Sequence, residues 1–316
     1  MNKIDVSFII LSYNKFDILR QSLYSIIANT KKISYEIIVF DNNSTDGEIS
    51  NELTELNNLV IYKNDENIGW SAGINKAISI TKGDYVCIVD NDVLLIDNVA
   101  LRLLEFCKSH KNIIVAPRIL NKDMSIQNTI ANFPSYTNRL SVAIFLNKIF
   151  PKSKLFNPDY LNFTISENQA ITVDTVMGAC LFFSKEVIQK VKGFDESLYF
   201  YAADYDICMR MYKNGGKVYY NSNAHAIHLG GIATGTNIHF SASQKGLDDI
   251  KFFRKHYSKY ERKLIYLFTL ISCFNRFMFF YLIGIICSDH EMKKKASFLL
   301  IYMRFFLKGV VSGDKK

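Results

Sequence analysis

Apolar and polar residues follow two distinct periodicities along the N-terminal third of the chain. Short apolar runs typical of buried strands are followed by segments in which apolar residues recur every three to four positions, as in amphipathic helices. Strands that alternate with helices predict a parallel sheet with helices on both faces. The predicted strands are 6–11, 35–42, 59–64 and 84–92, and the predicted helices are 16–30, a segment starting near Ser50, and 71–81.

The rest of the chain is less regular. Residues 133–170 have no clean period and contain three prolines, so we expect an irregular insertion with short helices over the site. Residues 170–194 return to a strand followed by a helix, and the pattern is helical from about Ala242 onward. We therefore predict an α/β domain over residues 1–240 and a helical extension over 241–316.

Acidic side chains stand where two predicted strands end. Asp41 follows one strand, and "VDND" (89–92) places Asp90 and Asp92 directly after another. Ligands of parallel sheets bind at the carboxyl ends of the strands. Two carboxylates on alternate residues of a loop could converge on one hard cation. The alternative is a turn in which Asp and Asn cap the backbone.

A second acidic pair lies in "YFYAADYDICMR" (199–210). On a helix, Asp204 and Asp206 point about 200° apart, so they cannot share one task. Asp206 precedes Arg210 by four residues, which predicts a structural ion pair. Asp204 heads an apolar face, and it is either a charge at a helix N-terminus or a pocket carboxylate with a shifted pKa.

Two further segments carry candidate ligand groups. "HAIHLGG" (225–231) offers two histidines ahead of glycines, which allow close backbone approach. The loop around 65–75 could bind a flat ring or a phosphate. The alternative is a helix N-terminus whose small residues serve packing. No GxGxxG follows the first strand and no GxxxxGK[ST] is present, which weighs against a dinucleotide oxidoreductase and a P-loop nucleotidase.

Composition indicates a reduced, globular protein with a basic C-terminal region. The formal charge is +8, and residues 251–263 are rich in Lys and Arg with a single Glu, which suits an anionic surface or a solvated helix face. Six scattered cysteines without a CxxC pair favour buried thiols over disulfides or a zinc site. The N-terminal apolar run is too short for a signal peptide. We see no nucleic-acid-binding module.

The apolar segment 264–287 is 24 residues long, enough to span a bilayer if wholly apolar. Arg276 interrupts it, at a cost of about 2.5–3.5 kcal/mol for insertion. Polar residues also recur every seventh position, at Lys255, Arg262, Thr269 and Arg276. We expect the basic and apolar region 251–309 to lie on an anionic membrane surface. The alternative is a helical subdomain packed on the α/β domain or in a homodimer.

Several motifs taken together resemble the family 2 glycosyltransferases of GT-A fold, in particular their bacterial rhamnosyltransferase-like branch. The resemblance covers about residues 5–232 and matches only loosely beyond. It rests on "SFIILSYN", "IIVFDNNSTDG", "NIGWSAGIN", "VDNDV", "VMGACLFF", "GFDESLYFYAADYDICMR" and "HLGG". It implies a GT-A, Rossmann-like, mostly parallel sheet flanked by helices, with the helical C-terminal extension.

The resemblance also implies roles for individual residues. Asp41 would contact the nucleotide base, Asp90 the ribose, and Asp92 and His228 a divalent cation, Mn²⁺ or Mg²⁺. Asp204 would be the catalytic base, although the acid that precedes this base in the family is Ala203 here. The full predicted set is Tyr13, Asn14, Asp41, Asn67, Gly69, Trp70, Gly73, Asn75, Asp90 and Asn91 for the nucleotide sugar, Asp92 and His228 for the metal, and Asp204 for catalysis.

The implied function is inverting transfer of a sugar from a UDP- or dTDP-sugar to a hydroxyl of a saccharide or lipid-linked acceptor, in bacterial surface polysaccharide synthesis. One base and no enzyme nucleophile means a single displacement. The expected location is cytoplasmic, peripheral on the inner face of the membrane. A catalytically silent assembly partner with the same fold is the alternative, and a nucleic-acid binder is disfavoured.

Overall fold

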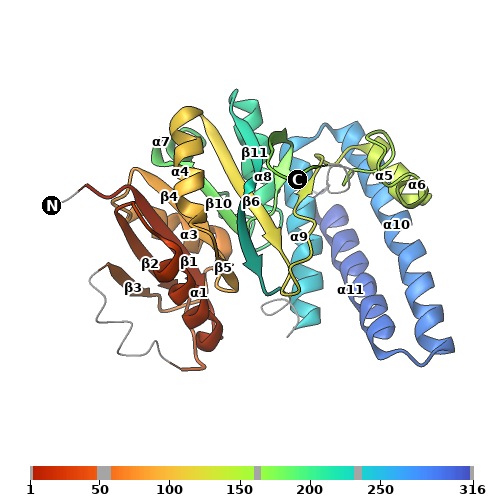
Figure 1. Ribbon diagram of the computed structural model, residues 1–316. Helices are drawn as coiled ribbons and strands as arrows, with labels where there is room; N and C mark the ends of the chain where they lie inside the picture. The colour runs from red at the N-terminus through yellow and green to blue at the C-terminus, as the bar shows by residue number, and fades with distance from the viewer. Residues whose placement is uncertain (1–2, 48–57, 160–164, 231–236, 314–316) are drawn as a thin grey trace. The chain divides into compact units, whose positions relative to one another are not determined.

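Buried strands form the centre of the fold. All eight residues of β6 (Ile113–Leu120) are buried, and β1 (Val6–Ser12) and β2 (Tyr35–Asp41) each have a single residue that is only partly covered. The computed structural model describes residues 3–47, 58–159, 165–230 and 237–313 (Figure 1). The helix that we expected near Ser50 falls outside these residues.

The central sheet combines a parallel and an antiparallel part. Its strands run in the order β3-β2-β1-β4-β10-β6-β11-β5, and β8 pairs with β11. The pairings of β1 with β2 and β4, of β2 with β3, and of β6 with β11 are parallel. Strand β10 is antiparallel to both neighbours, and β5 and β8 are antiparallel to β11. The other strand bounds are β3 Leu59–Lys63, β4 Tyr85–Val89, β5 Val93–Leu95, β8 Ala170–Val173, β10 Cys180–Ser184 and β11 Lys217–His228, and β7 (Ile130–Ala131) pairs with β9 (Thr175–Val176) in a small second sheet.

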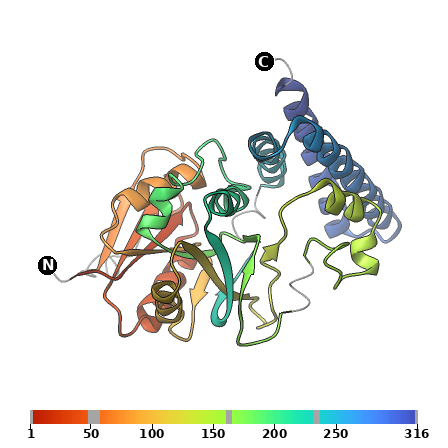
Figure 2. The same ribbon diagram turned by 90° about the horizontal axis from the view of Figure 1, so that it is seen from above.

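Helices cover both faces of the sheet, as the sequence predicts (Figure 2). Apolar side chains of α1 (Phe16–Asn29) and α4 (Val99–Ser109) pack with Phe8, Ile10 and other strand residues in one continuous core. The opposite face carries α3 (Trp70–Ser79), α7 (Lys185–Lys190) and α8 (Ala203–Lys213). The prediction of an α/β fold with a flanked central sheet is therefore confirmed. The sheet is mixed, however, and not mostly parallel, because β5, β8 and β10 run antiparallel to their neighbours.

The chain divides into two compact units. The sheet unit comprises Met1–Ala131, Ile165–Tyr199 and Ala203–Ile232, and the helical unit comprises Asn132–Thr164, Phe200–Ala202 and Ala233–Lys316. The sequence placed the insertion before residue 165 with the α/β domain. The structure groups it with the C-terminal helices, because α5 packs on α10 and Asn275 donates a hydrogen bond to the carbonyl of Ala143 at 3.0 Å.

The helical unit has its own aromatic core. Phe253 of α9, Tyr266 of α10 and Phe306 of α11 stack edge to face, and Tyr302 donates a hydrogen bond to Asp249 at 2.9 Å. The helices of this unit are α5 (Tyr136–Ala143), α6 (Leu146–Ile149), α9 (Ile238–His256), α10 (Lys259–Ile286) and α11 (His290–Gly313). Within the described residues, α10 alone is long and apolar enough to cross a membrane by length and composition.

The cysteines are free thiols in the described structure. Cys87, Cys107, Cys180, Cys208 and Cys273 are buried, and Cys287 is exposed. Burial raises the pKa of Cys107 and of Cys208 to about 12, so both stay protonated and unreactive at neutral pH. This agrees with the prediction of reduced, mostly buried thiols.

Candidate active site

The turn after β4 carries the acidic pair predicted from "VDND". The backbone N–H of Asp90 donates to the carbonyl of Ala179 on the neighbouring β10 segment, and the N–H of Val93 donates back to the carbonyl of Asp90. Asp92 is buried, and Asn91 lies half-buried in the turn between the two acids. Both carboxylates are therefore held at the carboxyl end of a central strand.

Pairing of β5 with β11 brings His228 to the same place. His228 stands opposite Val93 in this antiparallel register, and the N–H of Leu229 donates to the carbonyl of Asp92. Nε2 of His228 lies 3.2 Å from Oδ1 of Asp92. One ligand atom from each of Asp90, Asp92 and His228 falls within 4.8 Å of the others, so the three side chains form a cluster that a single ion could bridge.

The electrostatics of this cluster favour a bound cation. Burial, together with the negative charge of Asp92, raises the pKa of Asp90 to about 7. Burial lowers the pKa of His228, but the hydrogen bond to Asp92 and the charges of Asp92 and Asp90 outweigh it, and the net shift is upward. Two carboxylates and an imidazole are suitable ligands for a divalent ion, and a cation between them would relieve the repulsion between the acids.

Asp204 approaches this cluster from the first turn of α8. Its Oδ2 accepts a hydrogen bond from the N–H of Gly178 at 3.3 Å, and its Oδ1 accepts from the N–H of Tyr205 at 2.8 Å. Gly178 directly precedes Ala179, whose carbonyl binds Asp90. The charge of Asp204 also contributes to the raised pKa of Asp90, which places the two carboxylates within electrostatic reach.

The start of α3 and the loop before it lie next to the same acids. Nε1 of Trp70 donates to Oδ1 of Asp90 at 3.4 Å, and a Cβ placed on Gly178 would lie 3.7 Å from both the Trp70 ring and Cβ of Asp204. Asn67 accepts hydrogen bonds from the side chain of Asn42 and from the hydroxyl of Tyr199. These contacts bring the predicted residues Asn67, Trp70, Asp90 and Asp204 into one neighbourhood.

The segments after β1 and β2 are tied to each other. Oδ1 of Asp41 accepts a hydrogen bond from the N–H of Ser44, and the hydroxyl of Ser44 accepts one from the N–H of Asn14. The Asn14 side chain in turn accepts from the N–H of Thr45. Tyr13 is half exposed and presents its ring to solvent beside these loops. Tyr13, Asn14 and Asp41 thus stand at neighbouring strand ends, as the sequence predicts.

The comparison with family models decides what kind of protein this is. Residues 7–192, more than half of the chain, match the model described as glycosyl transferase family 2. The chain belongs to glycosyl transferase family 2. The match includes the segments that carry Tyr13, Asp41 and the Asp90/Asp92 pair, and it ends before α8 and β11.

Similar proteins carry glycosyltransferase names. Glycosyltransferase GlyA of Streptococcus pneumoniae is 39% identical over 89 residues, which is 28% of this chain and 13% of that protein. The putative colanic acid biosynthesis glycosyl transferase WcaA of Escherichia coli is 26% identical over 250 residues, covering 78% of this chain and 80% of that protein. The chain thus aligns with only a small part of GlyA and with most of WcaA.

Solved structures establish the fold class. The mannosyltransferase PcManGT of Pyrobaculum calidifontis, solved with GDP-Man and Mn²⁺, superposes with a TM-score of 0.62 at 13% identity and covers 100% of this chain and 89% of that one. At this identity the likeness concerns the fold alone. This family 2 glycosyltransferase therefore has the predicted GT-A fold. The rhamnosyltransferase-like branch is not distinguished by any of these similarities.

Three residues from the predicted motifs have structural contacts. A Cβ on Gly73 would lie 2.6 Å from Leu11, so this glycine permits close packing of α3 on the sheet. Asn75 donates to the carbonyl of Phe194 and to Glu196. Gly69 has φ +85°. Gly73 thus has the contact expected of a small packing residue, and Asn75, in the middle of α3, is held by hydrogen bonds. A donor-binding role for either residue stays a prediction.

Four residues that the sequence analysis did not single out support the site. Gly178 binds Asp204, Asn42 and Tyr199 hold the Asn67 loop, and Gln127 binds His228. Asn42 and Gly178 lie within the motifs "IIVFDNNSTDG" and "VMGACLFF". Gln127 lies in none of them, and it becomes adjacent to His228 only through the fold.

Proposed function

We propose that this family 2 glycosyltransferase is an inverting, metal-dependent enzyme. It moves a sugar from a nucleotide-sugar donor, a UDP- or dTDP-sugar, to a hydroxyl of a saccharide or lipid-linked acceptor in bacterial surface polysaccharide synthesis. The observation that carries the proposal is the grouping of Asp204 with Asp90, Asp92 and His228, which come from three separate segments of the chain.

Asp92 and His228 would hold the divalent cation, Mn²⁺ or Mg²⁺, with Asp90 beside them. When bound, this cation supplies stabilisation of the negative charge that develops on the departing diphosphate. Asp41 faces the nucleotide base, and Tyr13, Asn14, Asn67, Gly69, Trp70 and Asn91 line the donor. The side chains of Asp41, Asn14 and Asn67 are already hydrogen-bonded, so the donor meets a preorganised surface.

Asp204 acts as the base. An acceptor hydroxyl is a poor nucleophile until a carboxylate takes its proton as the new bond forms. The N–H groups of Gly178 and Tyr205 hold the Asp204 carboxylate in one orientation. A single base without an enzyme nucleophile gives one displacement at the anomeric carbon, with inversion. The buried Ala203 in front of Asp204 leaves one acid where the family has two.

The competing proposal is a catalytically silent assembly partner that keeps the GT-A fold. Its support is Ala203, which replaces an acid next to the base. Asp204→Asn separates the two proposals, because asparagine has the same shape and can still accept from Gly178. We expect turnover of the donor to fall about 10²- to 10⁴-fold, the usual contribution of a general base. Donor binding, read as a thermal shift with UDP- and dTDP-sugars and Mn²⁺, should persist. A wild-type chain that binds the donor but neither transfers nor hydrolyses it would favour the silent partner.

The helical unit is proposed to rest on an anionic membrane surface at the cytoplasmic side. Six apolar residues of α10 form an exposed stripe along one helix face at about 100° per residue. This apolar stripe is Leu267, Ile271, Phe274, Met278, Leu282 and Ile285. Thr269, one of the polar residues at seven-residue spacing, is buried instead, and so is Ser272. The exposed apolar face of the helix therefore points away from the aromatic core.

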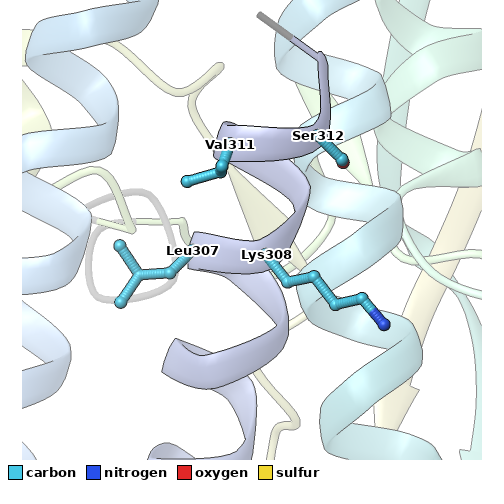
Figure 3. A pocket seen from close by; sticks show the side chains of 4 residues that line it. All are labelled: Leu307, Lys308, Val311 and Ser312. Atoms are coloured by element: carbon cyan, nitrogen blue, oxygen red, sulfur yellow. The ribbon is translucent and has the colours of Figure 1, made fainter. Parts of the chain in front are cut away.

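Exposed basic residues lie on two helices, α10 and α11. Lys259 and Lys263 of α10 and Lys293 and Lys295 of α11 are exposed. Four residues of α11 line a pocket: Leu307 and Val311 point to one side of the helix, and Lys308 and Ser312 point to the other (Figure 3). Apolar side chains flanked by lysines suit a membrane surface that contains anionic lipids. The apolar side chains would insert at the boundary between head groups and acyl chains, and the lysine ammonium groups would bind lipid phosphates. A homodimer through the same stripe is the alternative.

A further inference from the structure

A chain of hydrogen bonds leads from the surface to the imidazole of His228. Nδ1 of His228 lies 2.8 Å from Oε1 of Gln127, and Nε2 of Gln127 donates to Oδ1 of Asn121 at 3.1 Å. Nδ2 of Asn121 donates to the hydroxyl of Ser125 at 2.9 Å, and this hydroxyl donates to Oδ1 of Asp123 at 2.6 Å. Every step is within ordinary hydrogen-bond distance.

Asp123, at the exposed end of this series of hydrogen bonds, determines which atom donates and which accepts at each step. An ionised carboxylate can only accept, so Asp123 requires Ser125 to donate. The Ser125 oxygen then accepts from the amide nitrogen of Asn121, which turns the Asn121 carbonyl toward Gln127. Gln127 must present its nitrogen to that carbonyl and its own oxygen to His228. The consequence is that Nδ1 of His228 carries a proton and donates it to Gln127.

The backbone keeps these side chains in register. The segment after β6 is a tight turn in which the N–H of Asn121 donates to the carbonyl of Ser125 and the N–H of Met124 donates to the carbonyl of Asn121. The N–H of Gln127 donates to the carbonyl of Ile119 on β6. Because β6 pairs in parallel with β11, the turn and His228 are anchored to adjacent strands.

We propose that Gln127 is a positioning residue for the metal ligand His228. Its carbonyl accepts a hydrogen bond from Nδ1, so that in the neutral ring Nδ1 carries the hydrogen, and Nε2, which in the charged ring donates to Asp92, offers its lone pair to the cation. This inference rests on the metal role of His228 in the proposed function. Partners of this kind orient ligand histidines, and their loss typically weakens metal affinity 10- to 100-fold.

Nitrogen NMR of the full chain, labelled with ¹⁵N-histidine, tests the tautomer without any turnover. The signals of His228 are assigned from their disappearance in His228→Ala, and spectra are recorded at a pH where the ring is neutral. The wild type should show a protonated Nδ1 and an unprotonated Nε2. In Gln127→Leu the ring loses its acceptor at Nδ1, and Asp92 remains as an acceptor at Nε2, so the tautomer should shift toward Nε2–H. Gln127→Glu keeps an acceptor oxygen and should retain the wild-type tautomer.

Mn²⁺ affinity, measured from the free-ion signal in electron paramagnetic resonance, supplies the second readout. We expect it to fall about tenfold or more in Gln127→Leu and to be largely preserved in Gln127→Glu. If Gln127→Leu does not fold, Asn121→Leu removes the acceptor that orients Gln127 and should shift the tautomer in the same direction. An unchanged tautomer in the leucine variants would overturn the positioning role. A wild-type chain with the stated tautomer and no Mn²⁺ binding would instead overturn the metal role in the proposed function and support the orientation of the ring by Gln127.

Discussion

Nε of Arg210 lies 2.7 Å from Oδ2 of Asp206, one helical turn earlier in α8, and the Asp206 side chain is completely buried. Asp204, two residues before, is only partly covered and its carboxylate is turned toward Gly178. The two acids of "YFYAADYDICMR" therefore face different surroundings. The ion pair expected from the four-residue spacing is confirmed, and it separates the structural acid from the proposed catalytic one.

Asp206→Asn should destabilise the fold while Asp204→Asn should not. Removing one partner of a buried ion pair leaves the other charge uncompensated, and the free energy of unfolding should fall by about 3–5 kcal/mol. Asp204→Asn, at a partly exposed helix N-terminus, should change it by about 1 kcal/mol or less. Urea unfolding followed by circular dichroism measures both. Equal stabilities for the two variants would show that the Asp206–Arg210 pair has no structural role.

Gly69→Ala and Gly215→Ala compare a crowded glycine with an uncrowded one. Both glycines have positive φ, +85° and +70°. Gly69 also has ψ 177°, a combination that is essentially limited to glycine, so backbone strain adds to the steric contact in its alanine variant. A Cβ on Gly69 would also lie 2.7 Å from the carbonyl oxygen of Tyr199, whereas a Cβ on Gly215 meets nothing within 4 Å. We expect the Gly69 variant to be less stable than the Gly215 variant by about 1–3 kcal/mol in urea unfolding.

The Gly69 variant should also bind the donor more weakly, because the Asn67–Trp70 loop must move away from Tyr199. The thermal shift with a UDP- or dTDP-sugar measures this effect, and Gly215→Ala serves as the control for general strain. Identical stability and donor binding in the two variants would mean that the loop tolerates the extra methyl group.

Metal binding and stability should respond to pH in opposite directions. The folded pKa of Asp90, raised to about 7, exceeds its ordinary value of 3.8, so the folded state binds more protons between these values. Without a cation, the contribution of Asp90 to stability is therefore fully present at low pH and is lost as pH rises through about 7. A divalent cation competes with that proton, and its affinity should rise about tenfold between about pH 6 and about pH 8.

Mn²⁺ titrations and metal-free melting temperatures across this range test both signs. Asp90→Asn carries no titrating carboxyl and should show a flatter melting temperature profile. Mn²⁺ affinity that falls with rising pH would contradict the assignment of the cluster as a cation site.

Charges placed on the apolar stripe of α10 should release the protein from anionic vesicles. Phe274→Glu combined with Leu282→Glu puts two carboxylates on side chains that are each about half exposed, at 54% and 49%. Flotation with vesicles of phosphatidylglycerol and phosphatidylcholine should show at least about a tenfold loss of binding. The control is Tyr212→Glu, a 71% exposed aromatic residue on α8. If the wild type does not bind vesicles but forms a dimer, and the double variant is monomeric, then a second copy of the chain, and not a membrane, covers the apolar stripe.

Local sequence patterns predict much of the sheet unit. The strands starting at Val6 and Tyr35 and the helix starting at Phe16 occur within a residue of their predicted bounds, because a buried run and an amphipathic period are properties of neighbouring residues. The sequence pattern does not identify β11 as a strand, because polar residues, including Asn221, Ser222 and Asn223, interrupt the apolar alternation that is typical of strands.

By itself, the sequence determined the α/β class, the acids at the strand ends and the ion pair within α8, since each depends on residues close together along the chain. The resemblance assigned His228 and Asp92 to one cation, but only the tertiary structure shows how they meet, because that contact depends on the register of β5 with β11. The same is true of Gln127 at His228 and of the outward direction of the α10 stripe. A helix apolar around most of its circumference does not specify which face is buried, and packing against distant segments makes that choice.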